Sequence, residues 1–374
     1  MNISSSELLR QALDSLRELL GPGWQVQEFP EAEDGTAGDA VADSRVQLTP
    51  PDQQRFAELL VIAQTTVTPQ YADTQLRQIG TILRQARAAQ SLLVISPWIN
   101  AQAQQVLHKH GISYLDLTGN VSISIEHPSV RIETRGAAKS PRAPSESRTV
   151  TLSGVRAGRV IRFLADHRPP YRASQIASAT NVSLPWVSRL LGQLEDQLLI
   201  RRRKRTIVDV KWPEILRARA NTYDLLRHNS YVSAIALNGE TAVLDDLAQQ
   251  LQNDDALGKI TVTGHYAARL VAPYATGGQL MLYVEAGPHS PDAWANRLGL
   301  MRADGGNVLL LRAHDDVVFD RTRTVGGVPH VALSQLVLDS LAGPGRLPAE
   351  GEKVLDHMVE HQHEWRLPGP SDRD

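Results

Sequence analysis

Hydrophobic positions along the first part of the chain follow two spacings. Contiguous or alternating apolar residues predict strands at 24–29, 56–63, 92–95, 114–117 and 121–125, and apolar residues that return every three or four positions predict helices at 6–20, 71–88 and 101–110. The acidic, glycine-containing segment 31–43 has neither spacing and is expected to be a loop. Residues 1–135 are therefore predicted to form an α/β domain.

The last third of the chain, residues 230–366, alternates in the same way and predicts a second α/β domain. Its expected helices are 241–252, 265–271, 291–298, 332–341 and 348–362, and its expected strands are 259–263, 279–284, 308–311 and 328–331. Residues 136–148, GAAKSPRAPSESR, contain two prolines and three serines without apolar spacing, which predicts a linker. The ending LPGPSDRD, residues 367–374, is expected to be a disordered tail.

Between these regions, residues 149–229 predict three short helices. Apolar positions of the first helix start at Val155 and stop before two prolines, and a second helix is expected at 174–179. The residues 180–183 then predict a turn, because asparagine tolerates left-handed backbone and serine is a good residue to precede a helix. A third helix follows, with Pro185 in its first turn. This is the pattern of a helix-turn-helix.

The spacing of apolar residues predicts that the third helix has one apolar face and one polar face. A hairpin is expected after this helix. A strand begins at 198–200, the residues 201–205 are expected to form a basic turn, and 206–211 return as a second strand, which together predict a wing. A helix N-terminus suits phosphate, and an arginine such as Arg189 can pair with guanine. The residues expected to contact DNA are Arg172, Ser174, Ser183, Pro185, Trp186, Ser188, Arg189, Gln193, Arg201, Arg202, Arg203, Lys204 and Arg205. The fold class is thus a multidomain α/β chain with a central winged helix-turn-helix and two flanking α/β domains.

Charge is distributed unevenly along the chain. Residues 131–219 hold 19 Lys and Arg against 7 Asp and Glu, whereas the remainder holds 20 against 34, so the middle carries +12 and the flanks −14. Phosphate contacts supply most non-specific affinity for DNA, so a basic middle predicts a polyanionic partner. Aromatic residues make up only 5%, and single strands favour aromatic stacking platforms, so we expect duplex DNA.

Several classes of protein are disfavoured by composition. The absence of cysteine excludes disulfides and thiolate metal sites, and no apolar run has the length that crosses a bilayer. The N-terminal segment predicts an amphipathic helix and not a signal peptide, so we expect a cytoplasmic, nucleoid-associated protein. His357 and His361 lie one helical turn apart but lack a third ligand in the sequence. No metal and no cofactor is expected.

Most of residues 90–358 resemble actinobacterial-type regulators related to the AbiEi family of type IV toxin-antitoxin antitoxins. The resemblance rests on the winged helix, on GISYLDLTGNVSI at 111–123, on TGHYAARLVAPY at 263–274 and on GGNVLLLRAHDDVVFD with the later SQLVLDSLAGPGR. It implies the architecture of a DNA-binding regulator.

The N-terminal segment also resembles a degenerate PD-(D/E)xK nuclease-like fold. Active members end a strand in an acidic residue, a spacer and a lysine, which bind a metal ion and activate water. The resemblance places Ile62 and Gln64 at those two positions, so it implies no metal site here. Asp116, in YLDLTGN, is expected to hydrogen bond the turn at 118–120, with ligand contact as the less favoured role.

The C-terminal segment resembles a degenerate nucleotidyltransferase-like fold. Active members place Gly-Ser before a helix and two aspartates on the next strand to hold Mg²⁺. This chain has Gly264 and His265 at the first motif and only Glu285 as an acidic residue at the second. The resemblance therefore implies no catalysis. The acidic cluster of Asp315, Asp316 and Asp320 is expected to be a solvated edge.

We interpret the chain as a transcriptional regulator, not an enzyme, that reads double-stranded DNA as a homodimer. The flanking domains are expected to dimerise, sense a signal or hold a partner. One alternative is an antitoxin that represses its own operon and has a toxin or another protein as partner. A second alternative is a divergent metal-dependent nuclease or nucleotidyltransferase, which substitution of Asp116 or Glu285 would inactivate. The operator, the signal and the direction of regulation have no signature in the sequence.

Overall fold

The structure is a computed structural model of the whole chain, and it describes residues 4–30, 43–52, 55–85, 90–138, 152–253, 258–285 and 290–370. The chain divides into two compact units. The first comprises Met1–Thr149 with Gln193–Leu198, and the second comprises Val150–Gly192 with Leu199–Asp374. Of the loop expected at 31–43 only Asp43 lies in the described residues, and of the linker expected at 136–148 only residues 136–138 do.

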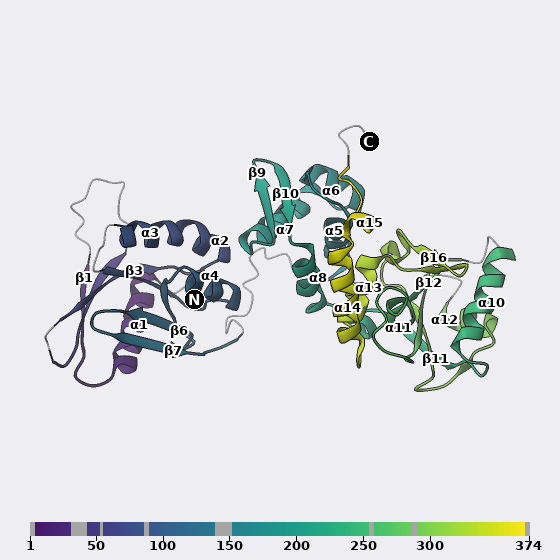
Figure 1. Cartoon of the computed structure of the whole chain (residues 1–374), viewed down its shortest axis with the longest axis horizontal. Helices are drawn as coiled ribbons and strands as arrows, with labels where there is room; N and C mark the ends of the chain where they lie inside the picture. The colour runs from purple at the N-terminus through teal and green to yellow at the C-terminus, as the bar shows by residue number, and fades with distance from the viewer. Residues whose placement is uncertain are drawn as a thin grey trace. The chain divides into compact units, whose positions relative to one another are not determined.

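The first unit is a seven-stranded sheet with helices on both faces (Figure 1). Its strands follow one another in sequence order from β1 to β7, antiparallel except for the parallel pairs β3 with β4 and β4 with β5. The elements are α1 (Ser5–Leu20), β1 (Gln25–Pro30), β2 (Ser44–Thr49), β3 (Ala57–Ala63), α2 (Pro69–Tyr71), the π-helical turn η1 (Ala72–Leu76), α3 (Arg77–Gln85), β4 (Gln90–Ser96), α4 (Ala101–Lys109), β5 (Ser113–Asp116), β6 (Val121–Ile125) and β7 (Val130–Thr134).

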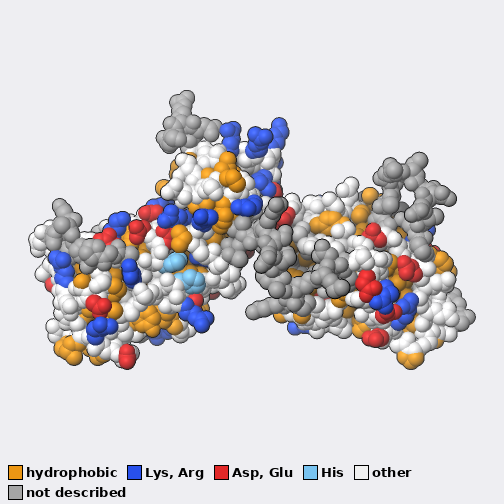
Figure 2. All heavy atoms as spheres, turned by 180° about the vertical axis from the view of Figure 1, so that it is seen from behind, with side chains coloured by type: hydrophobic (Ala, Val, Ile, Leu, Met, Phe, Trp, Pro, Cys, Tyr) orange, Lys and Arg blue, Asp and Glu red, His pale blue; other side chains and the backbone are white. Residues whose placement is uncertain are grey.

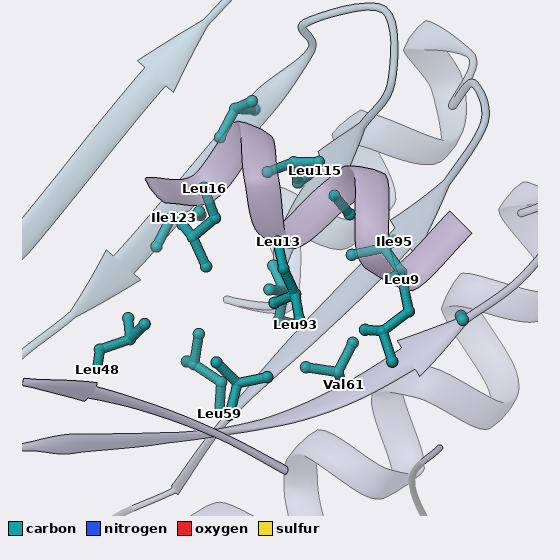
Figure 3. Close-up of a cluster of buried hydrophobic side chains, with 14 of the residues drawn as sticks. Leu9, Leu13, Leu16, Leu48, Leu59, Val61, Leu93, Ile95, Leu115 and Ile123 are labelled. Carbon is teal, nitrogen blue, oxygen red and sulfur yellow. The ribbon is translucent and has the colours of Figure 1, made fainter. Parts of the chain in front are cut away.

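Helix α1 covers one face of this sheet because its leucines return at helical spacing. The side chain of Ser4 accepts a hydrogen bond from the Glu7 N–H, which satisfies one of the free donors at the start of the helix. Figure 3 shows Leu9, Leu13 and Leu16 of α1 over the apolar side chains of the strands. A second buried cluster fills the opposite face beneath α2, η1, α3 and α4. The strands between the two clusters are thus buried on both faces.

Two strands of the first unit do not appear among the predicted elements. They are β2, with sequence SRVQLT, and β7, with sequence VRIET. In β2 every second residue is buried, but one of these buried residues is a serine, so Val46 and Leu48 are the only apolar residues of the strand. The helix predicted at 71–88 also differs, since it is divided among α2, η1 and α3.

The second unit begins with the winged helix-turn-helix, apart from Gln193–Leu198, which belong to the first unit. Its elements are α5 (Val155–Asp166), β8 (Tyr171–Arg172), α6 (Ala173–Thr180), α7 (Leu184–Asp196), β9 (Ile200–Arg203), β10 (Thr206–Val210), α8 (Trp212–Ala220) and α9 (Leu225–His228). The three short strands form one antiparallel sheet in the order β8, β10, β9. The architecture is therefore mixed α/β with a central helix-turn-helix, as the sequence predicts.

The rest of the second unit is a mixed seven-stranded sheet in the order β14, β11, β15, β13, β12, β17, β16. Strands β12 and β13 are buried along their whole length. The elements are β11 (Tyr231–Ile235), α10 (Glu240–Asn253), β12 (Ile260–Thr263), α11 (Gly264–Ala268), β13 (Leu280–Val284), α12 (Pro291–Arg297), β14 (Met301–Arg302), β15 (Val308–Arg312), the 3-10 helix η2 (Asp316–Phe319), β16 (Arg323–Val325), β17 (Val328–His330), α13 (Leu333–Leu341), α14 (Leu347–Glu360) and α15 (Gln362–Trp365).

The expectation of a disordered tail is wrong for residues 367–370. The Leu367 N–H donates to the Asp166 carbonyl at 2.8 Å, and the Leu367 carbonyl accepts from the Arg168 N–H at 2.8 Å. These backbone hydrogen bonds fix a segment that has no apolar spacing of its own. Residues 371–374 lie outside the described part of the chain.

Candidate nucleic-acid interface

The turn between α6 and α7 has the geometry that the sequence predicts. Asn181 adopts left-handed backbone with φ of 51°. The next N–H, that of Val182, donates to the Ala177 carbonyl at 3.1 Å, and the Val182 side chain is buried. The turn therefore closes α6 and directs the chain into α7, as in a helix-turn-helix.

Helix α7 presents a polar face because its apolar residues turn inward. Val187, Leu190, Leu191 and Leu194 are buried, as predicted. The Ser183 carbonyl accepts from the N–H groups of the helix start, those of residues 186 and 187, at 3.0 Å each, which makes Ser183 the residue that precedes the helix. Ser183, Pro185, Ser188 and Arg189 are exposed, whereas Trp186 and Gln193 are half-buried.

The wing differs from its prediction in one respect. Arg201, Arg202 and Arg203 belong to strand β9, and only Lys204 and Arg205 form the turn. Lys204 has a φ of 56°, which a two-residue hairpin turn requires. Strand β9 could not be predicted over its arginines, because a run of arginines has no alternation of apolar and polar residues.

The basic residues of the wing are distributed over two faces of the hairpin. Side chains alternate along a strand, so Arg201 and Arg203 are exposed on one face while Arg202 is half-buried. Asp209 stands opposite Arg201 in the strand register. Figure 2 shows Lys and Arg side chains gathered at the free end of this hairpin. The wing therefore presents an exposed basic surface of Arg201, Arg203, Lys204 and Arg205.

Strand β8 connects the wing to the beginning of α6. Arg172 pairs with Thr206, the first residue of the wing's return strand, and Tyr171 pairs with Ile207. The Arg172 N–H donates to Gln175 Oε1 at 2.7 Å, which closes the first turn of α6. Arg172 and Ser174 are exposed. Of the thirteen residues expected to contact DNA, all except Gln193 belong to the second unit.

Asp116 has the structural role that the sequence predicts. Asp116 is buried, with 2% of the residue exposed. Oδ1 accepts from the N–H and hydroxyl of Thr118 at 2.9 and 2.7 Å and from the Asn120 N–H at 3.0 Å. Oδ2 accepts from the Ile99 N–H at 2.9 Å and from the Asn120 side-chain amide at 2.8 Å. Five donors surround a buried anion, which leaves it little capacity for a ligand.

The acidic cluster after β15 is not a solvated edge throughout, and this corrects the prediction. The Asp315 side chain is 8% exposed and pairs with Arg159 of α5 at 2.7 Å. Asp316 and Asp320 are exposed, as expected. The cause is the packing of α5 against this segment, where Arg162 also donates to the Val317 and Asp320 carbonyls.

Two buried polar clusters of the second unit were not anticipated from the sequence. Asp339 of α13 is fully buried and accepts hydrogen bonds from Thr263, Tyr283 and Gln335. Burial raises the pKa of Asp339 to about 6. His265 pairs through Nδ1 with Glu350 at 2.9 Å, so it is held by a carboxylate. The polar positions on the mostly apolar helix α13 were the signal that could have revealed the first cluster.

The histidines and acidic residues of the described ranges do not gather into a metal site. Within them, no group of three or more His, Asp or Glu side chains is arranged to hold a metal ion. The ring of His357 on α14 stacks on the ring of His361, the residue that follows this helix, with 4.2 Å between the ring centroids. None of the helices in the described ranges is long and apolar enough to cross a membrane.

The central segment of the chain has a family-level similarity to known proteins. No curated protein matches the chain significantly. The solved structure described as "Structure of EndoMS in apo form" aligns with 18% identity over 31% of this chain and 47% of that chain, with a TM-score of 0.21. This chain thus covers about half the length of that protein. Residues 154–204 match the family described as "IclR helix-turn-helix domain", which supports a DNA-binding transcription regulator.

Proposed function

We propose that this protein is a transcription regulator that reads double-stranded DNA with α7 in the major groove and the wing against the phosphate backbone. The observation that carries the proposal is the exposed face of α7, with Ser188 and Arg189, beside a hairpin that exposes four basic side chains. Both features lie in or directly after the segment that matches the IclR helix-turn-helix domain.

Helix α7 supplies two kinds of contact. The start of α7 is exposed at Ser183 and Pro185, and the positive end of the helix dipole there suits a phosphate oxygen. Arg189 lies one turn further along on the exposed face, where a guanidinium can bind guanine through two hydrogen bonds. We therefore assign positioning to the start of α7 and base recognition to Arg189 and Ser188.

The wing and the start of α6 supply contacts that do not depend on sequence. Arg201, Arg203, Lys204 and Arg205 are exposed and carry permanent positive charge, which favours phosphates along the strand backbone. Arg172 lies beside the turn of the wing through its pairing with Thr206, the first residue of β10. Together these side chains would release counterions on binding, so the affinity should fall steeply with salt.

A single helix-turn-helix reads only a few base pairs, and two-fold pairing is the common way to lengthen the site. We therefore infer a homodimer, with the flanking α/β regions used for dimerisation, sensing or partner binding. Their non-catalytic role is supported by Ile62 and Gln64, whose side chains cannot act as a metal-binding acid and a catalytic lysine. The relation to AbiEi-type antitoxins stays a prediction, which a toxin-like gene beside this one would support.

The test is a binding titration of the full chain against its own upstream duplex and a scrambled duplex, over a salt series. Arg189→Ala should reduce the preference for the upstream duplex by about ten- to a hundredfold, which corresponds to one lost bidentate contact. Arg312→Ala is the matched control, because Arg312 is exposed at the end of β15, outside the winged helix. Equal affinity of the wild-type protein for both duplexes would contradict sequence-specific reading, and no binding to either would contradict the proposal.

A further inference from the structure

The last described residues of the chain, 366–370, lie along the winged helix, and we refer to them as the C-terminal strap. Leu367 forms a parallel bridge with His167, in the loop that follows α5. Both backbone groups of Leu367 are hydrogen bonded, to the Asp166 carbonyl and to the Arg168 N–H, at 2.8 Å each. In Figure 1 the yellow end of the chain runs from α15 past α6. Along the sequence, the strap lies about 160 residues after residue 204, where the match to the IclR helix-turn-helix domain ends.

Arg366 anchors the strap at the C-terminal end of α5. The last carbonyls of a helix lack partners within the helix, and a cation placed there is favoured by the helix dipole. The Arg366 guanidinium donates to the carbonyls of Ala165 at 2.8 Å, His167 at 2.6 Å and Leu164 at 3.3 Å. Arg366 is 7% exposed, so these hydrogen bonds form away from solvent.

Gly369 lets the strap approach the backbone of the winged helix closely. A Cβ at this position would lie 2.6 Å from the Pro170 carbonyl oxygen and 3.0 Å from the Arg168 carbonyl oxygen. Both neighbours are backbone atoms, which cannot rotate away as a flexible side chain would. Only glycine therefore allows this contact without a shift of the strap.

The strap ends at the first turn of α6. The Pro370 carbonyl accepts a hydrogen bond from Gln175 Nε2 at 2.9 Å. The other end of the same amide, Oε1, accepts from the Arg172 N–H at 2.7 Å. A single side chain therefore connects the end of the strap to the residue that precedes α6, next to the exposed Arg172 and Ser174.

We infer that the C-terminal strap is an integral part of the DNA-binding domain and positions the start of α6 against a phosphate of the duplex. The inference rests on the proposed function, because it assigns Gln175, Gly369 and Arg366 as positioning residues for that same interface. The strap continues from α14 and α15, so the helices of the C-terminal region are connected directly to the reading domain. Both hydrogen bonds of the Gln175 amide depend on its orientation, because Oε1 accepts from the Arg172 N–H and Nε2 donates to the Pro370 carbonyl.

Gly369→Ala tests the inference with one added methyl group and no change of charge. We expect faster hydrogen exchange at the amides of Arg168 and Leu367, because the methyl group displaces the strap. DNA affinity should fall by about three- to tenfold, as expected when a helix N-terminus loses an anion contact. The slope of log affinity against log salt should decrease by about 0.9, which corresponds to one lost phosphate contact. A general loss of folded protein would lower the apparent affinity without changing this slope.

Gly158→Ala is the matched control, because a Cβ there meets its nearest neighbour, on Arg219, at an ordinary 3.5 Å. It should leave exchange, affinity and slope unchanged. A chain that ends after Trp365 should reproduce the Gly369→Ala effect, and if it does not fold, Gly369→Ala alone decides. Faster hydrogen exchange in Gly369→Ala together with wild-type DNA affinity and a wild-type salt slope would overturn the inference. Unchanged hydrogen exchange in Gly369→Ala would also overturn it. Failure of the wild-type protein to bind DNA would instead overturn the proposed function, while the exchange result would still report on the strap.

Discussion

Arg159 of α5 and Asp315 form an ion pair with two hydrogen bonds, in which Nη2 donates to Oδ1 at 2.7 Å and Nε donates to Oδ2 at 2.9 Å. The pair joins the first helix of the winged helix to the segment that follows β15. Planar guanidinium and carboxylate groups fit each other in this arrangement, and the Asp315 side chain is only 8% exposed. The winged helix is therefore fixed to the C-terminal region by a specific contact as well as by apolar packing.

Arg159→Ala should destabilise the second unit by about 1 to 3 kcal/mol, because it leaves a nearly buried carboxylate without its charged partner. Urea unfolding followed by circular dichroism measures the change. Arg217→Ala is the control, since Arg217 makes a similar two-hydrogen-bond pair with Glu352 in which both side chains are more than 40% exposed. That exposed pair should contribute less than about 1 kcal/mol. Equal effects of the two substitutions would show that burial of Asp315 does not strengthen its pair.

Asp116→Ala should destabilise the first unit by about 3 kcal/mol or more, because five donors around a buried carboxylate lose their acceptor together. Thermal unfolding of the full chain is the measurement. Glu126→Ala, an exposed acidic residue on the adjacent turn, should change stability by less than about 0.5 kcal/mol. A stable Asp116→Ala protein would contradict the structural role and revive ligand contact as its explanation.

The helix-turn-helix could be predicted because local rules specify it. The apolar positions of α7, the prolines and the asparagine of the turn each act within a few residues, and the structure places them as expected. The wing was located correctly, but its arginine-rich strand was mistaken for a turn. Strands β2 and β7 were missed because polar residues occupy four of the six positions of β2 and three of the five of β7, which leaves too short an apolar pattern.

Long-range contacts account for what the sequence did not reveal. Arg159 and Asp315 are 156 positions apart, and Gln175 and the Pro370 carbonyl are 195 apart. Apolar spacing does not reveal such a pair, so Asp315 was expected to be solvated and residues 367–370 of the strap were expected to be disordered. Both errors have the same origin, because a short polar segment can be ordered entirely by partners from distant elements.

Stability should depend on pH through Asp339. Burial raises the pKa of this carboxyl from its usual value of 3.8 to about 6 in the folded protein. Between these values the folded state binds more protons than the unfolded state, so the stability present below pH 3.8 is lost as pH rises through 6. Asp339→Asn cannot titrate, so its stability relative to wild type should increase from pH 4 to pH 7 by about 3 kcal/mol at most. Urea unfolding at several pH values checks this, and a constant difference would contradict the raised pKa.

Removal of the exposed charges of the wing should weaken binding to every duplex by a similar factor. Substitution of Arg201, Arg203, Lys204 and Arg205 by glutamine keeps length and polarity but removes four charges, so the salt slope should decrease by about 0.9 for each side chain that contacts a phosphate. The preference for the upstream duplex over the scrambled one should persist, because Arg189 is intact. The matched control substitutes the exposed Arg227 and Arg312, which lie outside the winged helix sheet. A wing variant with the wild-type salt slope would exclude these side chains from the DNA interface and leave α7 as its main element.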